Sequence, residues 1–264
     1  MSKALIGHSG FVGSTLKKQT TFEHLYRSTN IHEIRDQSFN LLVCAGAPAE
    51  KWKANQNPKE DNRAIDKLIE HIDTVQCDTF VLISTVDVFN TPSQVDENTI
   101  IDKVNLQPYG YNRYRLEEFV QAKFQRSLII RLPGLVGPGL KKNIIFDLLH
   151  NNQVEKIDSE SLFQFYPMVN LWFDIQIALA NELALVHLTS EPISVAQVAS
   201  RGFGFKFENR TSEHPPSYNI KTCHASFYSE HEHYTYNATE SIQAIRAYAQ
   251  TEPLSKLNNK QIDK

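Results

Sequence analysis

The segment Lys3-Ala4-Leu5-Ile6-Gly7-His8-Ser9-Gly10-Phe11-Val12-Gly13 joins a short apolar run to three glycines spaced GxxGxxG. We expect residues 3–7 to form a strand and residues 11–18 a helix that opens inside the glycine loop. Glycines let the backbone turn sharply and approach a pyrophosphate, and a helix N-terminus offers amide donors to phosphates. The placement between strand and helix favours a dinucleotide loop, lined by Gly7, Ser9, Gly10, Phe11, Val12 and Gly13, over a tight turn without a ligand.

The alternation of short apolar runs with amphipathic runs continues over the first two-thirds of the chain. It predicts strands over residues 24–27, 41–45, 80–84 and 128–132 and helices over residues 58–72 and 109–124. This order is typical of βαβ units, so the predicted fold is an α/β Rossmann-type, doubly wound parallel sheet.

The alternation weakens after about Gly139. The remaining chain has an expected helix over residues 171–187, a polar and aromatic stretch over 214–236, a helix over 239–249 and a frayed tail from Asn258. We therefore predict a dinucleotide-binding domain over residues 1–165 and a small substrate-binding region over 166–264, partly interleaved with the first.

Composition excludes several classes of protein. The 264 residues are 41% hydrophobic and 22% charged, as in a soluble globular protein, and a net charge of -3 gives no general attraction to nucleic acid or to an anionic membrane. The most apolar stretch, 168–188, is interrupted by Asp174 and Glu182 and does not suit a membrane span. Three scattered cysteines fit a reducing cytoplasm, where we expect the protein.

The histidines invite a metal hypothesis that the spacing does not support. His231 and His233, with His214 and His224 upstream, form no carboxylate–histidine pattern on a recognisable helix or strand. We therefore expect no metal site.

The end of the second strand bears on the choice of nicotinamide cofactor. An acid about 20 positions after the first glycine holds a ribose 2′-hydroxyl, whereas a basic residue accommodates a 2′-phosphate. Arg27 stands there, with no acid at the strand tip, so the sequence favours NADP(H). Two alternatives stay open: Arg27 is a solvated surface residue, or Glu23 serves if the strand ends earlier.

Hydroxyl groups gather at the end of the strand over residues 80–84. Ser84, Thr85 and Asp87 lie at its carboxyl edge, where open α/β sheets bind ligands. Tyr109 and Arg113 are four residues apart and share one face of the following helix. A tyrosine beside a fixed cation and a hydroxyl partner suits proton donation to a carbonyl that accepts hydride. The alternative is a helix whose aromatic and basic residues pack its own surface.

These motifs resemble those of the extended short-chain dehydrogenase/reductases, the NAD-dependent epimerases and dehydratases that act on nucleotide sugars. The resemblance covers about residues 1–190 and rests on four segments: GHSGFVG at 7–13, Ser84-Thr85 with Val88-Phe89, Tyr109-Gly110-x-Asn112-Arg113 with Glu117, and RLPGLVGPG at 131–139. It implies hydride exchange with a nicotinamide and proton exchange by Thr85 and Tyr109, whose separation of 24 positions fits the family. It places Asn62 near the cofactor, and we also expect cofactor contacts from Ala45, Gly46, Ser84 and Pro133.

One position departs from the family, which has lysine where this chain has Arg113. Arginine keeps the charge, but its longer planar fork does not deprotonate and relays protons poorly. Two functions therefore remain: an NAD(P)-dependent reductase or epimerase of a nucleotide-linked sugar that uses Thr85, Tyr109 and Arg113, or a dinucleotide-binding sensor without turnover.

The substrate side and the assembly are also predicted. Asp87, Lys141 and Lys142 are candidate substrate contacts, the lysines through a diphosphate, although both lysines are equally explained as solvated loop charges. The resemblance implies a homodimer built from the helices over 58–72 and 109–124. Phe119 and Val120 need cover, either from a partner or within the chain.

Overall fold

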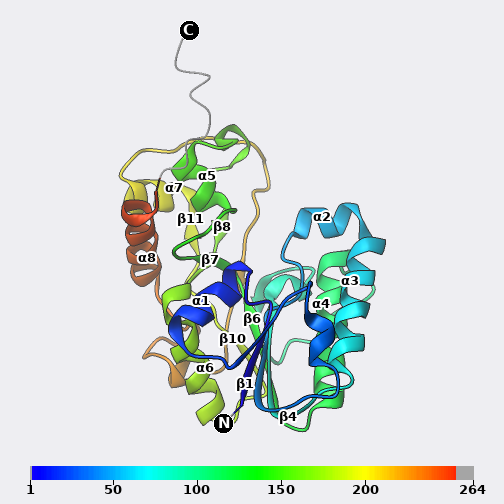
Figure 1. Ribbon diagram of the computed structural model, residues 1–264. Helices are drawn as coiled ribbons and strands as arrows, with labels where there is room; N and C mark the ends of the chain where they lie inside the picture. The colour runs from blue at the N-terminus through cyan, green and yellow to red at the C-terminus, as the bar shows by residue number, and fades with distance from the viewer. Residues whose placement is uncertain (1, 254–264) are drawn as a thin grey trace.

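A six-stranded parallel sheet organises the computed structural model, which describes residues 2–253 (Figure 1). Its strand order is β10-β6-β4-β3-β1-β2. The strands are β1 (Lys3–Ile6), β2 (His24–Tyr26), β3 (Ser38–Cys44), β4 (Gln76–Thr85), β6 (Ser127–Leu132) and β10 (Leu185–His187). With helices on both faces, this confirms the predicted α/β Rossmann-type doubly wound fold.

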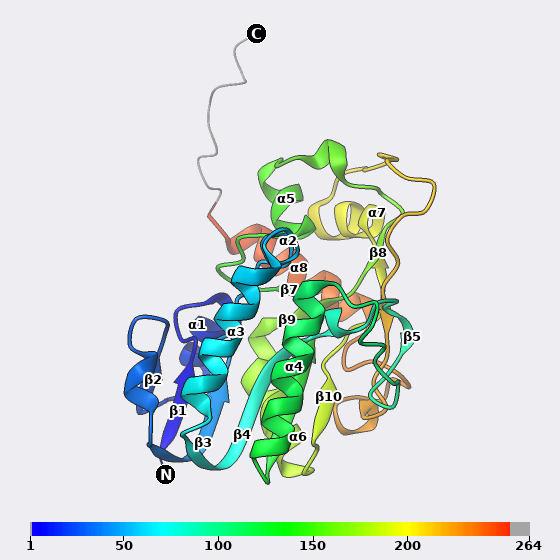
Figure 2. The ribbon, with the colours of Figure 1, turned by 90° about the vertical axis from the view of Figure 1, so that its right-hand side faces the viewer.

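Two pairs of helices form the outer layers. α3 (Pro58–Ile72) lies beside α4 (Pro108–Lys123) on one face, and α1 (Phe11–Gln19) contacts α6 (Leu171–Ala180) on the other (Figures 1 and 2). The helices predicted over 11–18, 58–72 and 109–124 are confirmed. α2 (Lys51–Gln56) has no counterpart among the predicted elements.

The single helix predicted over residues 171–187 is wrong. α6 ends at Ala180, Glu182 adopts a left-handed φ of 52°, and the chain then enters β10, which pairs with β6 at the edge of the sheet. Leu185 and Val186 continue the apolar run of α6, so the sequence alone does not separate helix from strand here, and pairing with β6 selects the strand.

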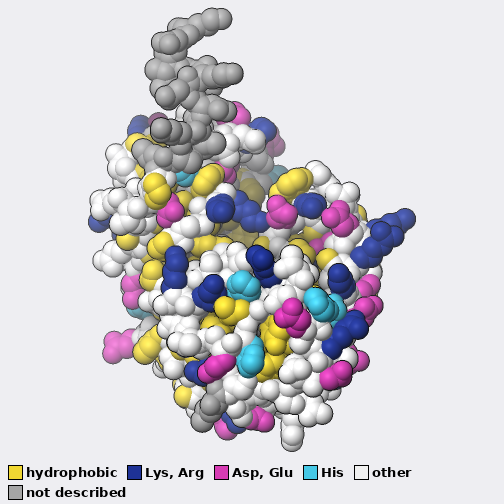
Figure 3. Space-filling model, in the orientation of Figure 1, with side chains coloured by type: hydrophobic (Ala, Val, Ile, Leu, Met, Phe, Trp, Pro, Cys, Tyr) yellow, Lys and Arg dark blue, Asp and Glu magenta, His cyan; other side chains and the backbone are white. Residues whose placement is uncertain are grey.

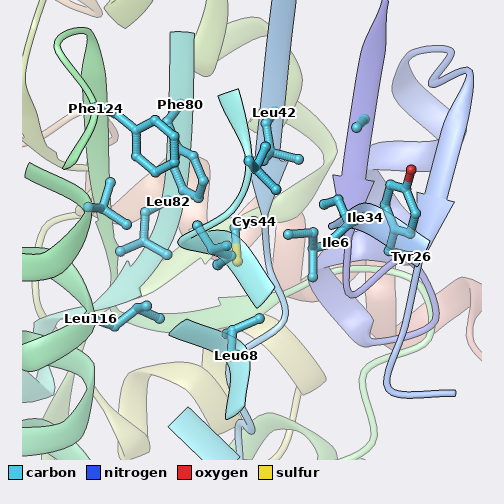
Figure 4. Close-up of a cluster of buried hydrophobic side chains, with 14 of the residues drawn as sticks. Ile6, Tyr26, Ile34, Leu42, Cys44, Leu68, Phe80, Leu82, Leu116 and Phe124 are labelled. Atoms are coloured by element: carbon cyan, nitrogen blue, oxygen red, sulfur yellow. The ribbon is translucent and has the colours of Figure 1, made fainter. Parts of the chain in front are cut away.

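Both faces of the sheet are buried in apolar side chains. On the α3–α4 face, Ile6, Cys44 and Leu82 from the strands meet Leu68 and Leu116 from the helices (Figure 4). Neighbouring residues of the same strands point to the opposite face and pack with α1 and α6. Burial on both faces explains why the strands read as continuous apolar runs.

A smaller cluster of elements lies above the sheet's carboxyl edge (Figure 1). It contains β7 (Gly134–Val136), α5 (Ile144–His150), β8 (Leu162–Phe163), β9 (Phe165–Pro167), β11 (Ile193–Ser194), α7 (Val195–Gln197) and α8 (Ala238–Thr251). Its core mixes Ile145 and Phe165 with Val195 and Ile245, so it draws residues from both sides of position 165. The predicted helix over 239–249 is confirmed by α8, whereas the tail from Asn258 lies outside the described residues. No described helix is long and apolar enough to cross a membrane.

Candidate functional site

The order of the strands reverses at the carboxyl ends of β1 and β3. From β1 the chain continues to β2 on one side, and β3 returns on the other side, which is the switch point where open α/β sheets bind ligands. The Gly7 N–H donates to Tyr26 O at 2.8 Å, and the Ala45 N–H donates to Ile6 O at 2.9 Å. These bonds bring the glycine loop, the end of β2 and the Ala45–Gly46 segment together.

The three glycines of the loop have different reasons to be glycine. Gly7 has φ of +83°, and a side chain there would collide with the Ala45 carbonyl; a side chain at Gly13 would collide with Gly7 O. At Gly10 the backbone is extended, and an added Cβ would meet only Gly7 O, at an ordinary 3.5 Å. Packing within the chain therefore requires Gly7 and Gly13, whereas Gly10 leaves open space at the N-terminus of α1. That space fits the close approach of a pyrophosphate.

Positively charged side chains lie near His8 of this loop. Arg27 follows β2, and its Nε donates to Thr29 Oγ1 at 3.0 Å. Burial and the charges of Lys17 and Arg27 lower the pKa of His8 in the glycine loop. The carboxylate of Glu23 lies before β2 and accepts the Lys3 N–H at 2.6 Å, at the opposite end of the strand. The structure thus excludes Glu23 as the residue at the strand tip and leaves Arg27 there.

The end of β4 meets the first turn of α4. Thr85 is the last residue of β4, and its Oγ1 accepts the Asp87 N–H at 3.1 Å. A side chain at Gly110 would collide with Asp87 O, so this glycine allows α4 to approach the turn that carries Thr85. The Tyr109 N–H donates to Asn55 Oδ1 of α2 at 3.0 Å. Two elements thus hold Tyr109 next to the carboxyl edge of the sheet.

Tyr109 is 9% exposed. Burial raises the pKa of Tyr109, while the positive charge of Arg113 opposes that shift. The guanidinium carbon of Arg113 lies 4.0 Å from the centroid of the tyrosine ring. Within residues 2–253 no group hydrogen-bonds the Tyr109 hydroxyl. The hydroxyl is therefore protonated at neutral pH and available to a ligand.

Arg113 does more than stack on Tyr109. It is 3% exposed and forms a buried ion pair with Asp61 of α3, and it also donates to the backbone oxygen of Pro48. Asp61 accepts a second hydrogen bond from Asn112 at 2.8 Å. The Arg113 Nε is buried and has no hydrogen-bond partner in the described part of the chain. The partner Asp61, on another helix, was not apparent from the sequence.

Ser84 and Asn62 direct their polar atoms to side chains elsewhere in the protein. The Ser84 hydroxyl donates to Glu117, which is held by Arg131 at 2.7 Å in the protein interior. Asn62 donates to Asp66 at 2.8 Å and lines the groove between α3 and α4. Their cofactor contacts stay predictions. Pro133 follows β6 directly beyond the Leu132 that pairs with Thr85, so it lies at the same edge of the sheet.

Two lysines reach the site from outside the sheet. Lys51 of α2, which the sequence did not single out, binds Asp87 Oδ1 at 2.7 Å and lies 3.4 Å from the Tyr218 hydroxyl. Lys142 spans to the loop after β3 and donates to Ala49 O at 2.7 Å. Lys141 is exposed beside it. Figure 3 shows Lys and Arg side chains along the hollow between the upper cluster and the sheet.

Neither a family model nor a curated protein matches the chain. Solved structures do match its fold. RMD from Pseudomonas aeruginosa, complexed with NADPH, is 14% identical with a TM-score of 0.71 over 95% of this chain and 99% of the other. A dTDP-4-dehydrorhamnose reductase from Yersinia enterocolitica gives the same four values. A UDP-glucose 4-epimerase from Thermotoga maritima, solved with UDP-glucose, is 13% identical with a TM-score of 0.69 over 95% and 98%. The chain therefore has the fold of nucleotide-sugar reductases and epimerases.

Proposed function

We propose that the protein is an NADP(H)-dependent reductase or epimerase of a nucleotide-linked sugar, in the extended short-chain dehydrogenase/reductase family. The observation that carries the proposal is the protonated Tyr109 hydroxyl, which has no hydrogen-bond partner in residues 2–253 and lies near Asp87, at the edge of the sheet where Thr85 and the glycine loop also lie. The fold shared with structures solved with NADPH and with UDP-glucose supports this assignment.

The bound nicotinamide would exchange a hydride with the substrate, and the protein would supply position and proton. Gly10 and the first turn of α1 would hold the pyrophosphate. Thr85 would hydrogen-bond the substrate oxygen. Tyr109 would donate its proton to that oxygen as the carbonyl becomes a hydroxyl. Because burial keeps Tyr109 protonated, this geometry suits reduction.

The substrate phosphates would lie toward the lysines. Lys142 donates to Ala49 O in the loop after β3, Lys141 is its exposed neighbour, and Lys51 is held by Asp87 next to Thr85. A diphosphate would attract the ammonium groups and compete with the Ala49 carbonyl for Lys142.

A direct assay tests the enzyme proposal against the sensor alternative. The purified protein is incubated with NADPH and a panel of nucleotide-linked keto sugars, and loss of NADPH absorbance is followed together with the product by mass spectrometry. Turnover of at least one keto sugar is expected. Tight NADPH binding with no turnover of any of them would support the sensor instead.

NADPH should bind more tightly than NADH, because Arg27 can pair with the 2′-phosphate and the charge of Lys17 adds to the positive field around His8. Arg27→Ala should weaken NADPH about tenfold, or 1.4 kcal/mol, and leave NADH unchanged. Fluorescence titration measures both constants. Lys18→Ala, also in the last turn of α1, is the matched control. Equal affinities of the wild type for the two cofactors would contradict the NADP(H) assignment.

We expect a homodimer through α3 and α4. Val120 is buried in the chain's own core and needs no partner. We therefore expect the contact surface at the outer groove between α3 and α4, which has a volume of about 480 Å³ and is lined by Tyr111. Tyr111 is 42% exposed. Light scattering at micromolar concentration should show a dimer for the wild type and a monomer for Tyr111→Glu. Phe173→Glu, at a position of α6 that is 67% exposed, should remain dimeric. A monomeric wild type would refute the dimer.

A further inference from the structure

A second cluster of reactive side chains shares no residue with the candidate active site. It lies where the chain after β5 (Ser93–Val95) meets the chain after β12 (Asn219–Ile220), two strands that pair with each other beside the descending gold and orange segment (Figure 2). Glu97, Cys223 and His224 each place one donor atom here, and the three atoms lie within 4.8 Å of one another. We propose that Glu97, Cys223 and His224 form a binding site for a zinc ion.

The chemistry of the three donors selects the metal. A thiolate, an imidazole and a carboxylate are the ligands of Zn²⁺, whereas Mg²⁺ and Ca²⁺ favour oxygen ligands alone. Ligands at tetrahedral zinc stand about 3.5 Å apart, so donor atoms that lie within 4.8 Å of one another need to approach by at most about 1.3 Å. Cys223 is exposed and His224 partly exposed, which gives both side chains room to rotate. Three protein ligands leave a fourth position for water.

Glu97 is already oriented for this task. Its Oε1 accepts the His187 N–H at 2.7 Å and the Thr222 hydroxyl at 2.6 Å, which occupies both lone pairs of that oxygen. Its Oε2 accepts only one backbone bond, from the Cys223 N–H at 2.9 Å, and the Cys223 thiol also hydrogen-bonds this carboxylate. When a metal displaces the thiol proton, the thiol's hydrogen bond is lost and one lone pair of Oε2 becomes free for the metal. The bonds on Oε1 fix the carboxylate as outer partners of metal ligands do.

On binding, the zinc ion takes the place of the proton on the Cys223 thiol. The S–H bond of Cys223 breaks, a S–Zn bond forms with the sulfur electron pair, and the proton passes to solvent. The His224 nitrogen and Glu97 Oε2 add their lone pairs, and no group is oxidised or reduced. In the described part of the chain no residue hydrogen-bonds the His224 ring, which only stacks on Phe227 at 6.1 Å. The nearby charge of Asp96 adds attraction for a cation.

Bound zinc would connect two distant parts of the chain. Glu97 and Cys223 are 126 positions apart and are joined at present by hydrogen bonds alone. The metal would therefore fix the segment after β12 against the edge of the sheet. The sequence predicts no metal site because its histidine spacings contain no motif, and only the fold brings Glu97 to the Cys-His pair.

Cobalt and zinc titrations of the full-length, chelator-treated protein test the site. With Co²⁺ the wild type should show a thiolate-to-cobalt charge-transfer band that saturates at one equivalent, and Zn²⁺ should abolish it by displacement. Equilibrium dialysis should then find one zinc per chain, and the melting temperature should rise with zinc. Absence of the band and of zinc uptake at micromolar metal would overturn the proposal.

Variants separate this site from other histidines and cysteines. Cys223→Ser, at an exposed position, should lose the band, and His224→Gln should lose tight zinc uptake, while both keep the melting temperature of the metal-free wild type. Cys77→Ser and His233→Gln are the matched controls and should bind like the wild type. A band that persists in Cys223→Ser, or uptake lost only in His233→Gln, would assign the metal elsewhere and refute the site. None of these readouts depends on nucleotide-sugar turnover.

Discussion

Tyr109→Phe should lower the turnover of every accepted keto sugar about 10²–10⁴-fold, the contribution typical of a positioned proton donor. The change removes only the hydroxyl, which has no hydrogen-bond partner in residues 2–253, so neither packing nor an internal bond is lost. The aromatic ring remains, and it keeps its contact with the guanidinium of Arg113. The affinity for NADPH and the melting temperature should therefore remain close to those of the wild type, and chemistry would separate from binding.

Tyr111→Phe is the matched control, because Tyr111 lies on the same helix with its side chain 42% exposed. It should leave turnover unchanged. If Tyr109→Phe turns over all accepted substrates at the wild-type rate, the assignment of Tyr109 as proton donor is wrong. Arg113→Lys does not test catalysis alone. The guanidinium of Arg113 donates to both Asp61 and Pro48 O, and a single ammonium group would not keep both contacts, so the change would also disturb the structure.

Gly10→Ala should affect mainly NADPH binding, whereas Gly13→Ala should affect mainly the stability of the fold. Gly10→Ala should weaken NADPH binding at least about tenfold, or 1.4 kcal/mol, because the new methyl group fills the space at the N-terminus of α1. It should change the free energy of unfolding by less than about 1 kcal/mol, since the methyl group meets Gly7 O only at 3.5 Å. Gly13→Ala should lower the free energy of unfolding by about 3 kcal/mol, because its methyl group collides with the Gly7 carbonyl inside the protein.

Urea unfolding and NADPH titration on the same preparations measure both effects. Ser14→Ala, the next residue of α1, controls for a general change in the helix, since its hydroxyl only bonds Phe11 O. A Gly10→Ala protein that binds NADPH as tightly as the wild type would place the pyrophosphate away from this loop. A Gly13→Ala protein of unchanged stability would contradict the described contact between α1 and Gly7 in the loop after β1.

The predictable part of this protein is local in sequence. The glycine loop, the apolar strands and the helices over 58–72 and 109–124 follow from spacing and periodicity within short windows, so the doubly wound fold could be predicted. The position of Thr85 at the carboxyl edge of the sheet could be predicted for a similar reason. Its pairing with Tyr109 in proton exchange came only from the resemblance to the extended short-chain dehydrogenase/reductases. The place of Arg27 at the tip of the second strand could also be predicted, from its distance of about 20 positions after the first glycine.

Contacts between distant segments could not be obtained in that way. The switch from α6 to β10 depends on pairing with β6, and the partners of Arg113 and Asp87 are Asp61 and Lys51, on other helices. Local sequence carries no signal for such pairs, because burial and ion pairing depend on which surfaces the fold brings together. The sequence alone determined the dinucleotide fold and a candidate proton donor. Only the tertiary structure decided that Asn55 binds the backbone of that donor, that Asp61 pairs with Arg113, and that Glu97 lies beside Cys223 and His224.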